Sequence, residues 1–267
     1  MSDEVENREF YYNPFNQKII QINSETLSYN LFDSTKNQFQ YRIDGSENLY
    51  VDGNSLNNEF RLIRMNLDSI EVLYRFSKNE GVFPIGVKQG KLYFIHCFYK
   101  ENGEEEYENR RLSIFDLNSH LIEDFREING LIDYGTLTND YIYYSKYIES
   151  DDIYHLMKIN YADLNGVPEY VRSLDEDGLI IGNSTEYYFV EENNLISNKN
   201  RFKKESINYF QDDSLVQFYI NQDNHLCLRI TETETNSITE FEDILGIRIL
   251  NERIQIRKKD EVLEYEL

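Results

Sequence analysis

Residues 141–160 read Tyr-Ile-Tyr-Tyr-Ser-Lys-Tyr-Ile-Glu-Ser-Asp-Asp-Ile-Tyr-His-Leu-Met-Lys-Ile-Asn. An aromatic and aliphatic run over 141–148 is followed by the polar residues 149–152, and a second apolar run covers 153–161. Aromatic and β-branched side chains favour strands, whereas Asp and Ser favour the tight turn between them. The stretch therefore predicts two antiparallel strands joined by a short acidic turn.

The chain continues in the same manner after this hairpin. A second turn, residues 163–166, contains Asp, Asn and Gly, and it leads to an expected third strand at 169–173. A short apolar stretch at 178–181 predicts a fourth strand. One structural unit is therefore expected to consist of four strands joined by tight turns.

The aromatic cluster of this unit recurs along the sequence. Its central residues are Tyr11, Tyr50, Tyr93, Tyr143, Tyr188 and Tyr219, separated by 39, 43, 50, 45 and 31 residues. A second landmark, an aliphatic strand that ends in Asn or Asp, follows at a similar period, with its last residues at Asn23, Asn66, Asp116 and Asn160. Four strands in every ~40–45 residues is the arithmetic of a β-propeller blade.

We therefore expect an all-β chain that folds as a single β-propeller of four-stranded antiparallel sheets, with seven blades, or six as the alternative because the fifth and seventh copies are weak. After a flexible acidic N-terminus at 1–7, the repeats are expected near 8–44, 45–87, 88–136, 137–182, 183–211, 212–250 and 251–267. The last repeat would close the ring with the N-terminus, which removes an open sheet edge. A solenoid or a two-sheet sandwich is the rival architecture, but a sandwich predicts no sequence period.

The innermost strands have their own signal. Short apolar stretches at 83–87, 131–134, 179–181 and 244–247 each precede an aromatic strand. Such stretches are typical of strands that are buried on both faces. We expect them to surround the axis of the propeller.

A family resemblance rests on the same landmarks. The doublet Tyr143-Tyr144, followed by Met157-Lys158-Ile159-Asn160, resembles uncharacterised bacterial propeller domains related to the YWTD propeller of low-density-lipoprotein receptors. The resemblance covers Glu9 to about Leu250, although the chain has no Trp and no Tyr-Trp-Thr-Asp motif. It implies a non-catalytic propeller that binds a ligand or another protein.

Charge excludes several classes of partner. The 267 residues include 27 Lys and Arg against 49 Asp and Glu, which gives a formal net charge of −22. This field repels phosphate backbones and anionic lipid surfaces, so we expect no nucleic-acid partner. A basic protein is the natural complement, because opposite potentials steer encounter. The alternative is that the acidity only keeps the chain soluble.

The sequence also predicts the compartment. No stretch approaches the ~18 apolar residues of a membrane-spanning helix, and residues 1–8 lack the basic and apolar regions of a signal peptide. We therefore expect no membrane insertion and a cytoplasmic protein, or an exported or lipid-anchored one if an N-terminal signal has been removed.

Motifs that carry chemistry are missing from the sequence. Cys97 and Cys227 stand apart from one another, and the four histidines are scattered over as many expected blades. No Gly-rich phosphate loop, HExxH, G-x-S-x-G or EF-hand pattern occurs. We accordingly expect no catalytic residue, no metal, no cofactor and no enzymatic activity.

Two acidic runs lie in equivalent turns, between the second and third strands of their units. They contain Glu104, Glu105, Glu106, Asp151 and Asp152. Because equivalent turns of a propeller lie on the same rim, these side chains are candidates for binding a basic protein, although ordinary solvated turns would show the same pattern. Our hypothesis is an acidic interaction module that acts as an inhibitor, an immunity protein or a scaffold. The alternative is a propeller whose central funnel binds, or hydrolyses, a small ligand or a carbohydrate.

Overall fold

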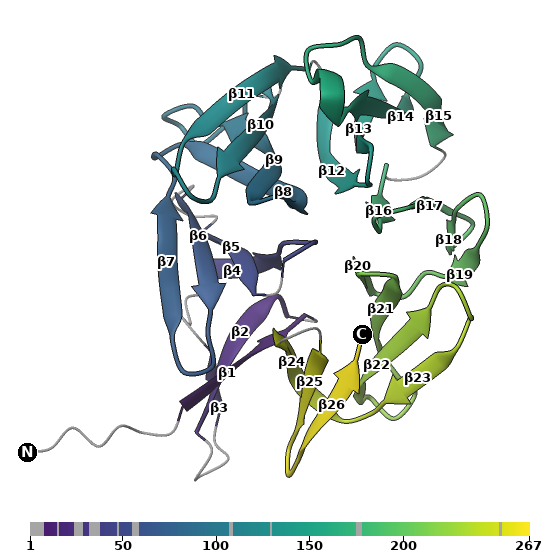
Figure 1. Cartoon of the computed structure of the whole chain (residues 1–267). Coiled ribbons are helices and arrows are strands. Elements are labelled where there is room, and N and C mark those ends of the chain that lie inside the picture. The colour runs from purple at the N-terminus through teal and green to yellow at the C-terminus, as the bar shows by residue number, and fades with distance from the viewer. Residues whose placement is uncertain are drawn as a thin grey trace, which may run out of the picture.

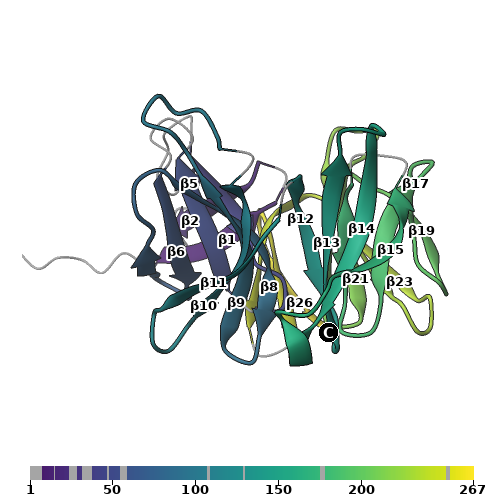
Figure 2. The ribbon, with the colours of Figure 1, turned by 90° about the horizontal axis from the view of Figure 1, so that it is seen from above.

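The computed structural model describes residues 8–14, 16–23, 29–31, 38–46, 48–54, 59–106, 109–128, 130–174, 178–250 and 253–267. The acidic residues 1–7 lie outside this part. Six antiparallel sheets surround a central axis like the blades of a propeller (Figure 1). In Figure 2, which is turned by 90°, the ring is seen edge-on and the strands run between its two faces.

Five blades have four strands each. The first two blades contain β4 (Gln38–Arg42), β5 (Leu49–Asn54), β6 (Glu59–Met65), β7 (Ile70–Arg75), β8 (Glu80–Lys88), β9 (Lys91–Phe98), β10 (Arg111–Asp116) and β11 (Ile122–Glu127). The next blade contains β12 (Leu131–Leu137), β13 (Tyr141–Ile148), β14 (Ile153–Asn160) and β15 (Glu169–Leu174). The last two contain β16 (Ile180–Gly182), β17 (Tyr187–Glu191), β18 (Asn194–Ile196), β19 (Arg201–Lys203), β20 (Ile207–Gln211), β21 (Ser214–Ile220), β22 (Leu226–Glu232) and β23 (Ile238–Phe241).

The predicted hairpin is confirmed. β13 and β14 pair over their whole length, from Tyr141 opposite Asn160 to Ile148 opposite Ile153. The predicted third strand is β15, and the predicted short fourth strand is β16, the innermost strand of the next blade. Each sequence repeat therefore has the length of one blade, but it begins at the second strand of a blade and ends at the first strand of the next one.

The Asn and Asp residues of the second landmark act through their side chains. Asp116 Oδ1 accepts hydrogen bonds from the N–H groups of Asn118 and Ser119, at 2.9 and 2.8 Å. Asn160 Oδ1 accepts the N–H of Ala162 at 2.7 Å, at the start of the short 3₁₀ helix Tyr161–Asp163. Such bonds stabilise the turn after the third strand of a blade, which explains why the landmark repeats.

Seven blades, the preferred expectation, is wrong, and six is the number that the structure has. The sixth sheet joins both ends of the chain in the order β26 (Val262–Glu266), β25 (Arg253–Lys258), β24 (Ile244–Leu250), β1 (Arg8–Asn13), β2 (Lys18–Asn23) and β3 (Tyr29–Leu31). The first and last repeats do not form separate sheets, because β1 pairs with β24 at Tyr12 and Ile247. Asn13 strengthens this junction, since its Nδ2 donates to the carbonyl of Leu245 at 2.9 Å.

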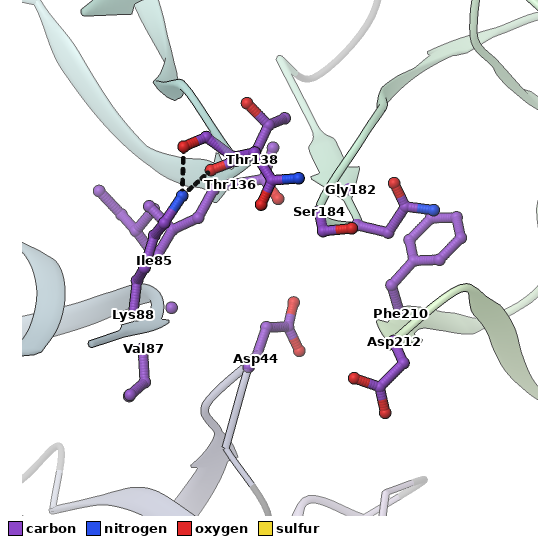
Figure 3. Close-up of a pocket in the computed structure, with 15 residues that line it drawn as sticks. Asp44, Ile85, Val87, Lys88, Thr136, Thr138, Gly182, Ser184, Phe210 and Asp212 are labelled. Atoms are coloured by element: carbon purple, nitrogen blue, oxygen red, sulfur yellow. Dashed lines mark hydrogen bonds between the residues drawn. The ribbon is translucent and has the colours of Figure 1, made fainter. Parts of the chain in front are cut away.

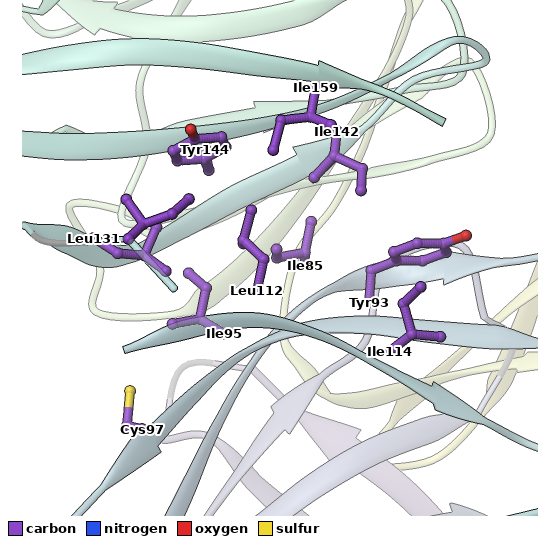
Figure 4. Packing of buried hydrophobic residues seen from close by; sticks show 11 residues of the cluster. Ile85, Tyr93, Ile95, Cys97, Leu112, Ile114, Leu131, Ile142, Tyr144 and Ile159 are labelled. Atoms are coloured by element: carbon purple, nitrogen blue, oxygen red, sulfur yellow. The ribbon is translucent and has the colours of Figure 1, made fainter. Parts of the chain in front are cut away.

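Blades adhere to each other through apolar side chains. In Figure 4, isoleucine and leucine side chains of β8–β10 face those of β12–β14. Ile95, Leu112 and Ile142 of this cluster are fully buried. Burial of each such side chain contributes about 1.5–3 kcal/mol, so the blade boundaries are the core of the protein.

The aromatic strands lie at these boundaries. The Tyr143 ring is buried and lies 4.4 Å, centroid to centroid, from the ring of Tyr187 in the next blade. The Tyr143 ring therefore packs between two neighbouring blades. No helix in the described part of the chain has the length and apolar character needed to cross a membrane.

Candidate functional site

The three glutamates of the first acidic turn have different environments. Glu104 is exposed to solvent, whereas the side chain of Glu105 is only 12% exposed. The guanidinium of Arg110 donates to Glu105 Oε1 at 2.6 Å, and Glu106 accepts a hydrogen bond from Asn109 Nδ2 at 3.3 Å. Glu105 is thus part of the fold, and Glu104 is the glutamate most open to a partner.

Both aspartates of the second acidic turn are exposed. Ser150 donates its hydroxyl to Asp151 at 3.0 Å, and Tyr147 donates to Asp152 at 2.8 Å. Asp152 has a φ of 52°, which closes the turn and is tolerated by Asp better than by most residues. Neither carboxylate has a cationic partner among the described residues, so both add negative potential to this rim.

A groove of about 730 Å³ brings the two turns together. It lies between the blade β8–β11 and the blade β12–β15, with Glu105 of the first turn and Glu149 of the second in its lining. Tyr147, Tyr154 and Asp133 also contribute to its walls. We call this hollow the inter-blade groove; of the five candidate residues, only Glu105 lines it, whereas Glu104, Glu106, Asp151 and Asp152 lie outside its lining.

Arg110 supports the floor of the inter-blade groove. Its guanidinium is buried and donates to Glu105, to the Leu131 carbonyl at 2.9 Å and to Asp133 Oδ1 at 2.7 Å. Burial raises the pKa of Asp133 above its usual value, and Arg110 counteracts part of this effect. Burial also raises the pKa of the nearby Cys97 thiol, which makes this cysteine unreactive.

Asp133 belongs to a second hollow, the central cavity. This cavity has a volume of about 420 Å³ and is lined from β1, β4, β8, β12, β16 and β20, so every blade contributes. Its aromatic residues are Tyr12, Tyr41, Phe83, Tyr134 and Tyr209. The inter-blade groove and the central cavity share Asp133, which makes them parts of one surface.

Arg42 and Asp44 lie at the inner end of the central cavity. Arg42 contacts Asp44 at 3.2 Å, donates to the Ser46 carbonyl at 3.1 Å and to Gln211, and stacks over the Tyr209 ring at 4.6 Å. Burial raises the pKa of Asp44 to about 6, although Arg42 lowers it. The Asp44 side chain is 30% exposed, and it lines both the central cavity and a second, smaller pocket. We call the two hollows together the channel.

The far end of the channel is a smaller pocket of about 180 Å³, in which Asp44 also takes part. In Figure 3, Asp44, from the blade β4–β7, and Asp212, from the blade β20–β23, both lie in this pocket. Lys88 Nζ is turned to the wall, where it donates to the carbonyls of Thr138, at 2.8 Å, and Asn139. The two carboxylates therefore give the narrow end a negative lining.

Gly45 fixes the place of Asp44. Its φ is +70°, and a Cβ at this position would lie 2.5 Å from the carbonyl oxygen of Val87. The Asp44 carbonyl accepts the N–H of Val87 at 2.8 Å. The chain can approach the neighbouring blade this closely only with glycine, and the approach holds Asp44 in the channel.

Histidines contribute nothing to the channel, since none of the four lines the central cavity or the pocket at its far end. His96 Nδ1 lies 2.9 Å from Asp124, and Ser113 donates to the same carboxylate at 2.6 Å. Ser113 thus directs its hydroxyl to Asp124 rather than to His96, which is not the geometry of a nucleophile and its base. In the described ranges, no three His, Cys, Asp or Glu side chains are placed to hold a metal ion.

Sequence reasoning found the two turns and placed the stretch 131–134 at the axis, but it assigned no role to Asp133 and missed the channel residues Arg42 and Asp44. None of them belongs to a chemical motif. The one local signal was the pair Asp44-Gly45 directly after the strand Gln38–Arg42, and that strand had not been expected to be innermost.

Solved structures share this fold. TolB from Acinetobacter baumannii aligns with a TM-score of 0.55 and 12% identity, over 90% of this chain and 64% of TolB. An uncharacterized protein from Listeria monocytogenes aligns with a TM-score of 0.52 and 10% identity, over 98% of this chain and 94% of that protein. No family model and no curated protein sequence matches the chain, and nothing links it to the YWTD propellers. The likeness establishes the β-propeller fold alone.

The expectation that the chain is not an enzyme is overturned by a further similarity. An acylaminoacyl peptidase aligns with a TM-score of 0.52 and 10% identity, over 93% of this chain and 46% of the peptidase. The chain spans about half the length of that enzyme, so this fold occurs within enzymes as well as outside them. At this identity the likeness assigns no reaction to this chain.

Proposed function

We propose that this protein binds a basic segment of a protein partner in the inter-blade groove. The observation that carries the proposal is that Glu105 and Glu149, from acidic turns of two neighbouring blades, line the same groove. Glu104, Asp151 and Asp152 extend the acidic border outward. An inhibitor, an immunity protein or a scaffold would use such a surface in the same manner.

Electrostatics supports this reading. The net charge of −22 attracts a basic partner from a distance, and the exposed carboxylates concentrate the field at the rim. Complementary charge acts mainly on the association rate, which salt screens over a Debye length of ~8 Å at physiological ionic strength. Tyr147 and Tyr154 supply ring surface along the groove for the alkyl portions of Lys or Arg.

The test uses a fluorescein-labelled nonalysine peptide as a basic probe. Its association rate is measured by stopped flow at low and high salt, for the wild type and for the triple variant Glu104→Gln, Asp151→Asn, Asp152→Asn. We expect the variant to associate several-fold more slowly at low salt, and the difference to shrink as salt rises. The fold should survive, because exposed turn charges contribute little to stability.

A matched control separates the groove from the overall charge. The variant Glu71→Gln, Glu123→Gln, Glu234→Gln also removes three negative charges, but from exposed positions on β7, on β11 and between β22 and β23. It should slow association much less than the groove variant. Equal slowing by both variants would show that the charge acts only as a general field, and the proposal would fail.

A further inference from the structure

The central cavity combines aromatic walls with carboxylates. Tyr41 and Phe83 lie 6.5 Å apart, centroid to centroid, and Tyr134 and Asp133 share the lining with them. Asp133 is 41% exposed, and Asp44 lines the same cavity. Volumes of ~300–1,000 Å³ are typical of pockets for small ligands, so a cavity of about 420 Å³ is large enough for one.

Tyr209 adds ring surface to the wall of the cavity and is only 7% exposed. Its hydroxyl oxygen has no hydrogen-bond partner within the described ranges, but it is also inaccessible to solvent, so Tyr209 contributes to the site through its ring.

We propose that the central cavity binds a small organic cation, an ammonium or guanidinium group carried on an aromatic or alkyl body. Asp133 pairs with the cationic group, and the rings of Tyr41, Phe83 and Tyr134 surround its apolar body. Cations are attracted to aromatic faces, and the attraction is stronger where water is excluded.

The charges of the cavity favour a cation over an anion. The guanidinium of Arg42 already contacts Asp44 and donates to the Ser46 carbonyl and to Gln211, and its Nε, which has no partner in the described part of the chain, is inaccessible to solvent. Burial raises the pKa of both Asp44 and Asp133, because a charged carboxylate is costly where water is excluded. An added positive charge would lower this cost.

Isothermal titration of the whole chain with three compounds of equal size tests the proposal. The probes are 2-phenylethylamine, 2-phenylethanol and phenylacetate, which present a cation, a neutral hydroxyl and an anion on the same ring. We expect the amine to bind at least tenfold more tightly than the alcohol, and phenylacetate not to bind. Equal binding of amine and alcohol, or no binding of the amine at millimolar concentration, would overturn it.

Two variants locate the site. Asp133→Asn should weaken amine binding about tenfold while Arg110 keeps its bond to Glu105. Tyr134→Leu changes a side chain that is 37% exposed, so it should fold normally and also weaken binding. Asp212→Asn, at the far end of the channel, is the matched control and should leave binding unchanged. An unchanged affinity in both Asp133→Asn and Tyr134→Leu would refute the site, whatever the nonalysine measurements show at the groove.

Discussion

The side chain of Asn48 forms two hydrogen bonds with the backbone of Ile249, 201 residues away. Its Nδ2 donates to the Ile249 carbonyl at 2.6 Å, and its Oδ1 accepts the Ile249 N–H at 3.4 Å. The Asn48 side chain thus makes two hydrogen bonds to the edge of β24, as a residue of a neighbouring strand would. β1 itself pairs with β24 only at Ile247. The side chain extends the junction between the two ends of the ring.

The first prediction follows from this contact. Asn48→Ala leaves a donor and an acceptor of Ile249 without partners, and we expect the free energy of unfolding to fall by about 1–3 kcal/mol. Urea denaturation, followed by circular dichroism, measures the change. Asn198→Ala, an exposed position with the same substitution, is the control and should have little effect. Equal stability of the two variants would show that the contact does not contribute to closure.

The second prediction concerns the packing between blades. Tyr143→Ala removes a ring that is buried against Tyr187, and the loss should be about 3–5 kcal/mol, as for other buried aromatic residues. Tyr170→Ala removes an exposed ring and should cost far less. Both changes in the free energy of unfolding are obtained from the denaturant midpoints, provided that the dependence of this free energy on denaturant concentration is the same for all variants. A small effect of Tyr143→Ala would mean that the blades do not depend on their aromatic strands.

The third prediction concerns Asp44 and pH. Its pKa rises from 3.8 to about 6 on folding, so the folded state holds more protons than the unfolded state between these values. This group therefore contributes stability at low pH, and the contribution is lost as the pH rises from about 4 to 6. Comparison of melting temperatures across this range should show a flatter profile for Asp44→Asn than for the wild type. Direct titration of the Asp44 carboxyl by NMR with a midpoint near 4 would contradict the prediction.

Asp124 should show the opposite sign. Hydrogen bonds from His96, Ser113 and Arg111 hold its pKa far below the usual value, with the His96 bond as the largest cause. Its contribution to stability is present above about pH 4 and is lost as the pH falls further. Asp124→Asn should therefore cost about 1–3 kcal/mol at pH 7, and the difference from the wild type should narrow below pH 4. A constant difference between pH 7 and pH 3 would show that the charge of Asp124 is not what matters.

How much the sequence could predict depends on the range of the interaction. The strands around Tyr143 and the turn at Asn160 are encoded locally, by side chains that favour strands and by an amide that closes its own turn. Each copy repeats this local chemistry, so the period was visible without any structure. The acidic turns were found for the same reason.

The blade number and the channel depend on contacts between distant residues. The sequence predicted that the last repeat closes the ring with the N-terminus, but it did not indicate that Tyr12 pairs with Ile247 and so joins the first and last repeats into one sheet. Asp44 and Asp133 meet around the axis only because separate blades bring them there. The complete ring brings these two carboxylates into one cavity, so no short stretch of sequence predicts the cavity.

The six-stranded closing sheet has a consequence for the synthesis of the protein. Asn13 leaves the ribosome 232 residues before its partner Leu245. Until β24 has been translated, β1 has an unpaired edge, which invites wrong pairing with other chains. We expect the nascent chain to fold its middle blades as they emerge, and to become resistant to proteases and to aggregation only when β24 has paired with β1.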